Sequence, residues 1–408
     1  MAAAVTGAAV TGAAVTGAAP LLKVRTVTCG LSLTRTEPAA SRTAAIERAA
    51  AFIRAAEAAY TSAGFEVQTT RIAVNSFEEW CDVADGEATL TTFRQLDATL
   101  ERLGVGLFNA GPATTAAGLA LVPSIVALGP RISASGALAD PLDVTGASRL
   151  ADTILRISTS TPGGEGNFQF CASFNVPPGI PFFPAAYHRG ETAFAIGCET
   201  SALLDEALPQ ADGDLPRAQQ LLTRVFEQQM RPVEEIARSL ASEHAIRYDG
   251  IDASVAPLGT APPLTAAFES LGLGRFGQSG TLAVASLVTA ALKAIGDGVT
   301  ICGYSGLMLP PCEDAGLAQR ASESPTGYRI HDLLAYSAVC GLGLDTVPIP
   351  GDVPQPKLAA LLLDVAALAF RLGKPLTARL FPVPGKAAGE MTEFANPILC
   401  NTRVFDVP

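Results

Sequence analysis

Hydrophobic patterning alternates between two periods along most of this chain. Residues 24–33 and 65–74 are short runs rich in β-branched side chains, which favour β-strands. Between them, residues 41–63 repeat apolar side chains every three or four positions, as a helix with one buried face does. Strands that alternate with helices favour parallel βαβ units, so this pattern predicts an α/β fold.

The same alternation continues toward the C-terminus. Helices are expected at residues 92–103, 216–240, 264–271, 281–295 and 357–371, and strands at 105–109, 298–302 and 376–381. Pro232 is expected to kink or split its helix. No linker is evident, so we expect one large α/β domain over residues 23–408, and a division near residue 215 as the second choice. Ligands in parallel α/β folds gather outside the carboxyl ends of the strands.

The N-terminus differs from the rest of the chain. Residues 2–19 repeat the sequence Ala-Ala-Val-Thr-Gly. A period of five residues matches neither helix nor strand geometry, and the glycines interrupt any regular element. We therefore predict a disordered, low-complexity tail over residues 1–22.

Composition excludes several classes of partner. The net charge of −11 argues against binding to nucleic acid. No apolar run reaches the ~18–20 residues of a membrane span, and no secretory signal is evident. The eight cysteines form no CxxC pair, which favours reduced thiols and a cytoplasmic location. Only 16% of the residues are charged, and a surface with few charges suits contact between copies of the chain, so a homo-oligomer is expected.

The densest group of candidate residues lies in residues 158–190. This segment is rich in proline, glycine and aromatic residues, a combination that is typical of an irregular segment shaping a pocket. Its candidate catalytic residues are Glu165, Asn167 and His188. His188 is interpreted either as a proton carrier or as a hydrogen-bonded structural residue.

A second group follows the strand expected at residues 298–302. Cys302, Tyr304 and Ser305 come where that strand ends, and Glu313 stands near the start of the next helix. Cys302 is a nucleophile if a base lies beside it, and otherwise a packed thiol. Tyr304 and Ser305 are expected to contact substrate. Glu313 suits either catalysis or the N-terminus of the helix, where a carboxylate is favoured.

Two further groups suit an anion. Gln278, Ser279 and Thr281 belong to a glycine-rich turn before a helix, whose backbone N–H groups can hold a phosphate or carboxylate; a simple tight turn is the alternative. Arg71 and Asn75 lie on or just after a strand. Arginine binds carboxylate or phosphate in a bidentate manner, although a surface salt bridge explains Arg71 equally well.

Several catalytic motifs are absent from the sequence. It contains no HExxH, no GxSxG, no phosphate-binding Walker loop and no Cys/His cluster at zinc spacing. The three histidines are scattered, which argues against a multi-histidine metal site. A Mg²⁺ or Ca²⁺ ion held by carboxylates stays an open alternative. No flavin or NAD is expected.

Motifs spread over the chain resemble a known family. The segments VRTVTCGLSL, NVPPGIPFFPAAYHRG, GYSGLMLPPCEDAGLA and CGLGLDTVPIPG resemble domain-of-unknown-function family 711. The resemblance implies an α/β barrel of the pyruvate formate-lyase type, related to glycyl radical enzymes. The chain has neither the Cys-Cys pair nor the C-terminal radical loop of those enzymes, so a glycyl radical mechanism is rejected.

Together these features predict an enzyme that acts on a small, polar, anionic metabolite by acid/base chemistry, in the hydrolase or lyase class. Arg71 and the turn that includes Thr281 would hold the anion. His188 or Glu165 would move a proton, and Asn167 would orient the substrate. A protein that binds or senses a small ligand without catalysis is the alternative.

Overall fold

The computed structural model describes residues 20–259, 261–296, 298–323 and 327–408. The tail predicted for residues 1–22 therefore lies outside the described residues, except for its last three. No described helix has both the length and the apolar character that crossing a membrane requires.

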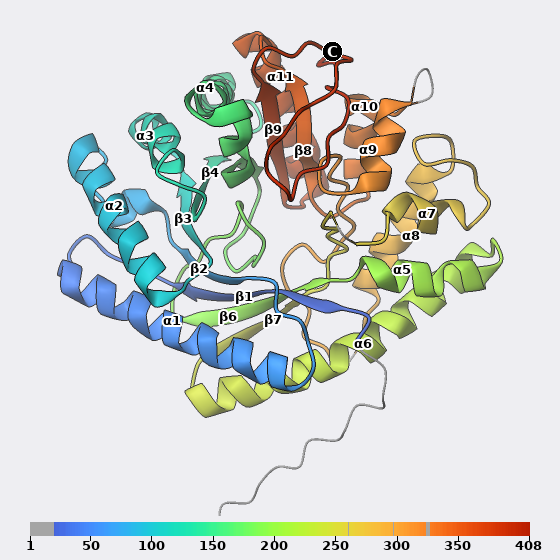
Figure 1. The fold of residues 1–408 in the computed structure, drawn as a ribbon, viewed down its shortest axis with the longest axis horizontal. Helices are drawn as coiled ribbons and strands as arrows, with labels where there is room; N and C mark the ends of the chain where they lie inside the picture. Colours follow the sequence, from blue (N-terminus) through green and yellow to red (C-terminus); the bar gives the residue numbers. More distant parts are fainter. Residues whose placement is uncertain (1–19, 260, 297, 324–326) are drawn as a thin grey trace, which may run out of the picture.

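Nine strands of the described chain form one sheet, in the order β7-β6-β1-β2-β3-β4-β5-β9-β8 (Figure 1). The strands are β1 (Lys23–Leu31), β2 (Thr70–Val74), β3 (Leu107–Ala113), β4 (Ile132–Leu138), β5 (Phe170–Phe174), β6 (Ala193–Glu199), β7 (Arg247–Asp252), β8 (Gly343–Pro350) and β9 (Leu376–Val383). Strands β1 to β5 are parallel neighbours, as the alternating pattern predicts. Strands β6 and β9 join this block antiparallel, and each has a parallel partner of its own.

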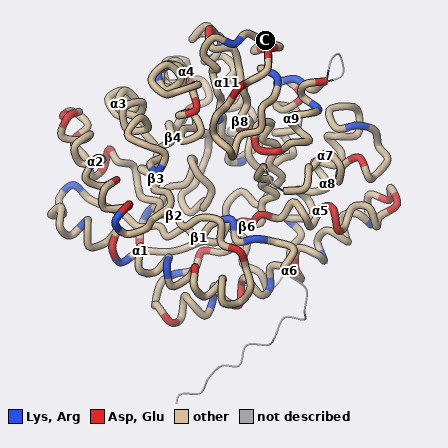
Figure 2. Tube along the Cα trace, viewed as in Figure 1, with Lys and Arg blue, Asp and Glu red and all other residues tan. Residues whose placement is uncertain are grey.

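The helices lie along the outside of the bent sheet (Figure 1). They are α1 (Ala39–Ser62), α2 (Gly86–Leu103), α3 (Ala116–Val126), α4 (Val144–Ser160), α5 (Ser201–Ala207), α6 (Leu215–His244), α7 (Leu264–Glu269), α8 (Thr281–Lys293), α9 (Ala315–Ser322), α10 (Ile330–Ser337) and α11 (Gln355–Leu372). Charged residues of both signs are spread over these outer elements and their loops (Figure 2).

Local sequence signals set several helix ends. Asp85 accepts a hydrogen bond from the backbone N–H of Ala88 at the start of α2, and Gly104 ends that helix in a left-handed conformation. Asp214 caps α6 in the same way. The expected split of α6 does not occur: Pro232 lies inside one continuous helix. Its neighbours Met230 and Val233 are buried, so packing of the apolar face offsets the lost hydrogen bond.

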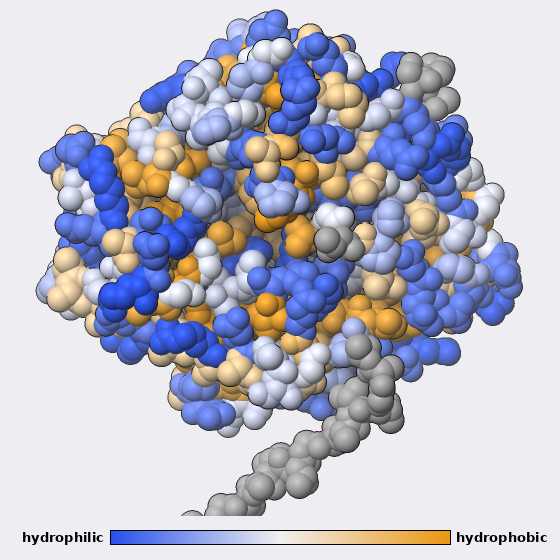
Figure 3. All heavy atoms as spheres, in the orientation of Figure 1, coloured by the Kyte–Doolittle hydropathy of each residue, from blue (hydrophilic) through white to orange (hydrophobic). Residues whose placement is uncertain are grey.

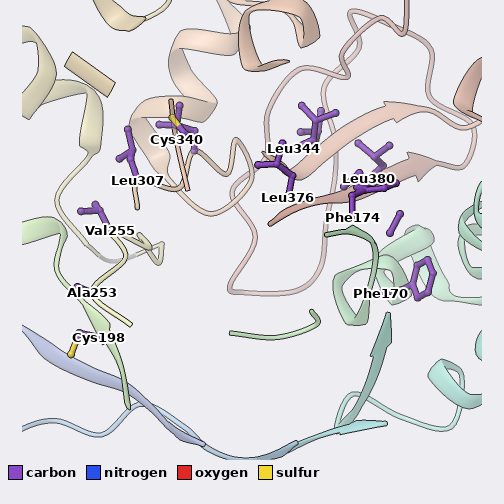
Figure 4. Packing of buried hydrophobic residues seen from close by; sticks show 14 of the residues in the cluster. Phe170, Phe174, Cys198, Ala253, Val255, Leu307, Cys340, Leu344, Leu376 and Leu380 are labelled. Carbon is purple, nitrogen blue, oxygen red and sulfur yellow. The ribbon is translucent and has the colours of Figure 1, made fainter. Parts of the chain in front are cut away.

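Most of the apolar core lies between the sheet and these helices. Phe170 and Phe174 of β5 meet side chains of the neighbouring β9, including Leu376 and Leu380 (Figure 4). A smaller cluster around Phe182 and Met308 is separate from this core. Apolar residues also reach the surface near the centre of the face seen in Figure 3.

The sheet is open, with β7 and β8 at its edges. The strand predicted at residues 298–302 is not formed; Ile301 makes only an isolated bridge to Ile251. Further along, Leu307 bridges Val255, and its carbonyl accepts a hydrogen bond from the N–H of Gly341 at 2.7 Å. The α/β class is confirmed, whereas closure into a barrel of the pyruvate formate-lyase type is not.

Candidate functional site

A cavity of about 90 Å³ is lined by side chains from several strands and from the loops between them. Its charged residues are Arg25 on β1, Arg71 on β2, Asp345 on β8, Arg379 on β9 and Glu313 in the loop before α9. Since one water needs roughly 10–15 Å³ of such space, the cavity has room for several waters or one small metabolite.

Irregular backbone aims two of these side chains into the cavity. The pairing of β1 with β6 shifts register between Val24 and Thr26, where Arg25 lies. The pairing of β8 with β9 shifts between Leu344 and Val347, where Asp345 lies. Bulges of this kind redirect side chains and are common beside functional sites.

The position of the cavity along the strands differs from the expected one. Arg25 and Arg71 are the third and second residues of their strands, so the cavity lies toward the amino ends of β1 and β2. The general preference for carboxyl ends applies to open sheets covered by helices on both faces. Here loops cover the inner face of the bent sheet (Figure 1).

Arg379 holds the two carboxylates of the cavity. Its Nε donates to Asp345 Oδ1 at 2.6 Å, and another nitrogen of its guanidinium donates to Glu313. Its guanidinium carbon lies 4.8 Å from the ring centroid of Phe168. Burial raises the pKa of the Glu313 carboxyl, although the neighbouring Arg379 opposes that rise.

Arg25 is held more loosely. It lies 3.4 Å from Glu313 Oε2 and donates to the carbonyl oxygens of Ala256 and Pro257 at 3.2 and 3.4 Å. Glu313 therefore lies between two guanidinium groups.

Arg71 has no counterion among the described residues. Only its Nε makes a hydrogen bond, to Thr69 Oγ1 at 3.0 Å, and its guanidinium carbon lies 5.1 Å from the ring centroid of Phe183. The side chain is only 6% exposed. Burial, together with repulsion from Arg25 and Arg379, lowers the pKa of Arg71 to about 9. A buried cation without a partner is costly, and a bound anion would remove that cost.

Tyr304 offers a second unsatisfied group in the same cavity. Its hydroxyl is buried and makes no hydrogen bond of ordinary geometry in the described chain, although the Thr377 side chain is close enough to lower its pKa slightly against burial. The backbone that carries it is held firmly, because Asp252 accepts from the N–H groups of Tyr304 and Ser305 at 2.8 and 2.9 Å. Burial raises the pKa of Tyr304 well above its usual value, so the hydroxyl keeps its proton at neutral pH.

Three of the predicted site residues thus meet in one cavity: Arg71, Tyr304 and Glu313. Two others, Cys302 and Ser305, lie on the same turn as Tyr304 but do not line the cavity. Ser305 Oγ donates to the carbonyl of Cys302 at 2.7 Å. Burial raises the pKa of the Cys302 thiol well above its usual value, which is the reverse of the shift that activates a nucleophilic thiol.

The three candidates of residues 158–190 lie elsewhere. Glu165 accepts from the N–H of Ala395 at 2.6 Å, and Asn167 donates to the carbonyl of Ile154 at 3.2 Å. His188 lines a separate, smaller pocket. Its Nε2 is 2.7 Å from the carbonyl oxygen of Glu191. Each of these side chains has at least one hydrogen-bond partner, although the buried Oδ1 of Asn167 has none in the described chain, and the three residues do not converge on one site.

The remaining candidates also make local contacts. Asn75 Oδ1 accepts from the N–H of Leu33 at 2.7 Å, and Asn75 Nδ2 donates to the carbonyl of Leu33 at 3.0 Å. Thr281 Oγ1 accepts from the N–H of Gly277 at 2.9 Å. Gln278 and Ser279 are exposed on the same turn. This turn lies outside the cavity, and anion binding there stays a prediction.

Sequence reasoning missed Arg25 and Arg379. A signal was present for both arginines, since each lies within a mostly apolar strand, in the segments KVRTV and LTARLF. A charge in a strand that is buried on both faces needs a partner.

No group of three or more His, Cys, Asp or Glu side chains in the described part of the chain is placed to hold a metal ion. The charged groups of the cavity are mainly paired with one another.

Comparison with known proteins places the chain in a family. The model of the family described as Uncharacterised ACR (DUF711) matches residues 18–396. A UPF0210 protein of Pyrobaculum arsenaticum is 31% identical, over 82% of this chain and 78% of its own length. A UPF0210 protein of Methanopyrus kandleri is 28% identical, over 95% of this chain and 91% of its own. The chain therefore belongs to the DUF711 family.

Proposed function

We propose that the chain is an enzyme that binds a small anionic metabolite in the cavity between Arg71 and Tyr304 and acts on it by acid/base chemistry. The observation that carries this proposal is the buried guanidinium of Arg71, which has no carboxylate partner in the described chain. Proteins pair buried charges, so a cation left free inside a cavity suits a ligand of opposite charge.

Two groups of the cavity suit proton transfer. Glu313 has a raised pKa, which allows it to take up a proton. Tyr304 carries a protonated hydroxyl without an internal partner. In this proposal Glu313 and Tyr304 replace His188 and Glu165 as proton carriers, because the latter two lie away from Arg71. Hydrolase or lyase chemistry fits such groups.

A ligand-binding protein without catalysis is the second candidate. Both carboxylates of the cavity contact Arg379, and a carboxylate held in an ion pair is a weaker base. This observation favours a role in which the charged groups only position the ligand. A cytoplasmic homo-oligomer and an α/β barrel of the pyruvate formate-lyase type stay proposals as well.

The test is a thermal-shift screen of the purified protein against small carboxylates and phosphates at constant ionic strength. A ligand at ten times its dissociation constant should stabilise the protein by about 1.4 kcal/mol. The stabilisation should disappear in Arg71→Met and persist in Arg102→Met, whose arginine forms an exposed ion pair with Glu47. If no anion stabilises the wild-type protein at millimolar concentration, the proposal is wrong.

A bound anion then allows the two candidates to be separated. The enzyme hypothesis expects slow chemical change of the bound anion, followed by mass spectrometry, and strong loss of turnover in Glu313→Gln and Tyr304→Phe. If every anion that binds is recovered unchanged, the ligand-binding hypothesis is favoured.

A further inference from the structure

The charges around the cavity limit the charge of its ligand. Arg25 and Arg379 are balanced by Glu313 and Asp345, which leaves Arg71 as the single excess charge among the lining residues. A ligand with one negative charge would neutralise the cavity. A dianion would bring a second charge into a desolvated space without a free cation to receive it.

A further carboxylate lies outside the lining residues. Glu199 is buried near Arg25, and its attraction raises the pKa of that arginine against the effect of burial. Its Oε1 accepts from the N–H of Ser201 at 2.9 Å. Glu199 offsets positive charge at Arg25 and so argues against a dianion, while Arg71 stays the lining cation without a carboxylate partner in the described chain.

The guanidinium of Arg71 is oriented before any ligand binds. Thr69 accepts from its Nε, and Phe183 packs on its face. Its two terminal nitrogens make no hydrogen bond to the described residues. This leaves one edge, with two parallel N–H groups, for an incoming anion. A planar carboxylate matches two parallel donors.

The other lining residues indicate the chemical character of the part of the ligand that Arg71 does not bind. Phe182, Ala256, Met308 and Leu342 supply apolar surface, and the Tyr304 hydroxyl supplies one unused polar group. A volume of about 90 Å³ suits a small molecule rather than a polymer.

We propose that the ligand is a small organic monocarboxylate with a short apolar body and one hydroxyl or carbonyl group that meets Tyr304. This inference rests on the proposed function, since it names the chemical class bound at the same anion site. The carboxylate lies against the terminal nitrogens of Arg71, and the polar group bonds the Tyr304 hydroxyl.

The experiment compares dissociation constants by calorimetry at pH 7.5 and constant ionic strength. The probes are butyrate, its three singly hydroxylated derivatives, succinate and inorganic phosphate. At least one hydroxybutyrate should bind more tightly than butyrate. Succinate should bind at least tenfold more weakly than that hydroxybutyrate, because it carries a second negative charge at this pH. Phosphate should also bind more weakly, because most of it carries a second negative charge at this pH.

Variants then assign the two contacts. Tyr304→Phe should weaken the best hydroxybutyrate about three- to tenfold and leave butyrate unchanged. Arg71→Lys keeps the charge and loses the paired donors, so it should weaken every carboxylate about tenfold or more. Arg102→Met serves as the control and should change none of these constants.

The possible outcomes separate this inference from the proposed function. If phosphate or succinate binds more tightly than every monocarboxylate, the ligand class is wrong and the anion site stands. If no probe binds and no other anion stabilises the protein in the thermal-shift screen, both the ligand class and the anion site are wrong. Equal binding of butyrate to wild type and Arg71→Lys would overturn the bidentate contact. These comparisons include wild-type rankings, which do not depend on how well a variant folds.

Discussion

Replacing Arg71 by methionine should stabilise the ligand-free protein, although the substitution removes a buried side chain with several contacts. The pKa of Arg71 is lowered from its ordinary value of 12.5 to about 9. That shift corresponds to roughly 5 kcal/mol, at about 1.4 kcal/mol for each pH unit. It measures the cost of keeping the guanidinium charged inside the cavity.

Part of this cost is offset by contacts that the substitution also removes. The hydrogen bond to Thr69 contributes about 1 kcal/mol, and the contact with Phe183 about 1–2 kcal/mol. We therefore expect Arg71→Met to raise the free energy of unfolding by roughly 2–3 kcal/mol, in the range found when buried charges are replaced by apolar residues. At any pH below the folded-state pKa, the charged guanidinium lowers the free energy of unfolding by its full amount. This destabilisation decreases as the pH rises through that pKa, because the guanidinium then loses its proton in the folded protein. At pH 7.5 the full cost is present.

The same substitution at Arg379 should have the opposite effect. Arg379→Met leaves the carboxylates of Asp345 and Glu313 buried without their shared partner, which should cost about 3–5 kcal/mol. Urea unfolding of the ligand-free wild type and both variants at pH 7.5 gives the comparison. If Arg71→Met loses more than about 1 kcal/mol relative to wild type, then Arg71 is not an uncompensated charge, and the argument for an anion site fails.

Three further predictions test the local structure. Gly30→Ala should lower the free energy of unfolding by about 1–3 kcal/mol, because its Cβ would lie 2.2 Å from Nδ1 of His188; wild-type stability would show that the ring is free to move. Cys302 should resist iodoacetamide at pH 8 in the native protein and react after unfolding, since its thiol has a raised pKa; rapid native labelling, mapped by mass spectrometry, would contradict this. Asp252→Asn should lower the free energy of unfolding by about 1–3 kcal/mol, because its NH₂ group would replace one of the two oxygens that accept from the N–H groups of Tyr304 and Ser305. An unchanged urea midpoint would argue against a role of Asp252 in holding this turn.

Much of the fold could be predicted because the relevant signals are local. The helix expected at residues 41–63 appears as Ala39–Ser62, and the one expected at 357–371 appears as Gln355–Leu372. Both follow from the spacing of apolar residues on one face. The strand expected at residues 298–302 is reduced to one bridge. Ile251 of β7 donates to the carbonyl of Thr300 at 2.7 Å and accepts from the N–H of Cys302 at 2.9 Å, and only Ile301 is bridged to β7.

The candidate site was predictable only in part. Arg71, Tyr304 and Glu313 were recognised by residue type, but nothing in the sequence separated them from His188 or Glu165. All five are polar residues in plausible segments. The structure separates them by what each side chain already contacts. His188 and Glu165 have local partners, whereas Arg71 has no counterion in the described chain.

The sequence by itself determined the α/β class, the helix ends set by capping residues and the absence of several catalytic motifs. These depend on residues that are near one another along the chain. Only the tertiary structure decided that β6 and β9 pair antiparallel with the central strands, and that Glu313 lies between Arg25 and Arg379. Such pairings join residues far apart in sequence, 288 positions in the case of Arg25 and Glu313. Their electrostatic energies depend on distance and burial in space, which local patterns do not contain.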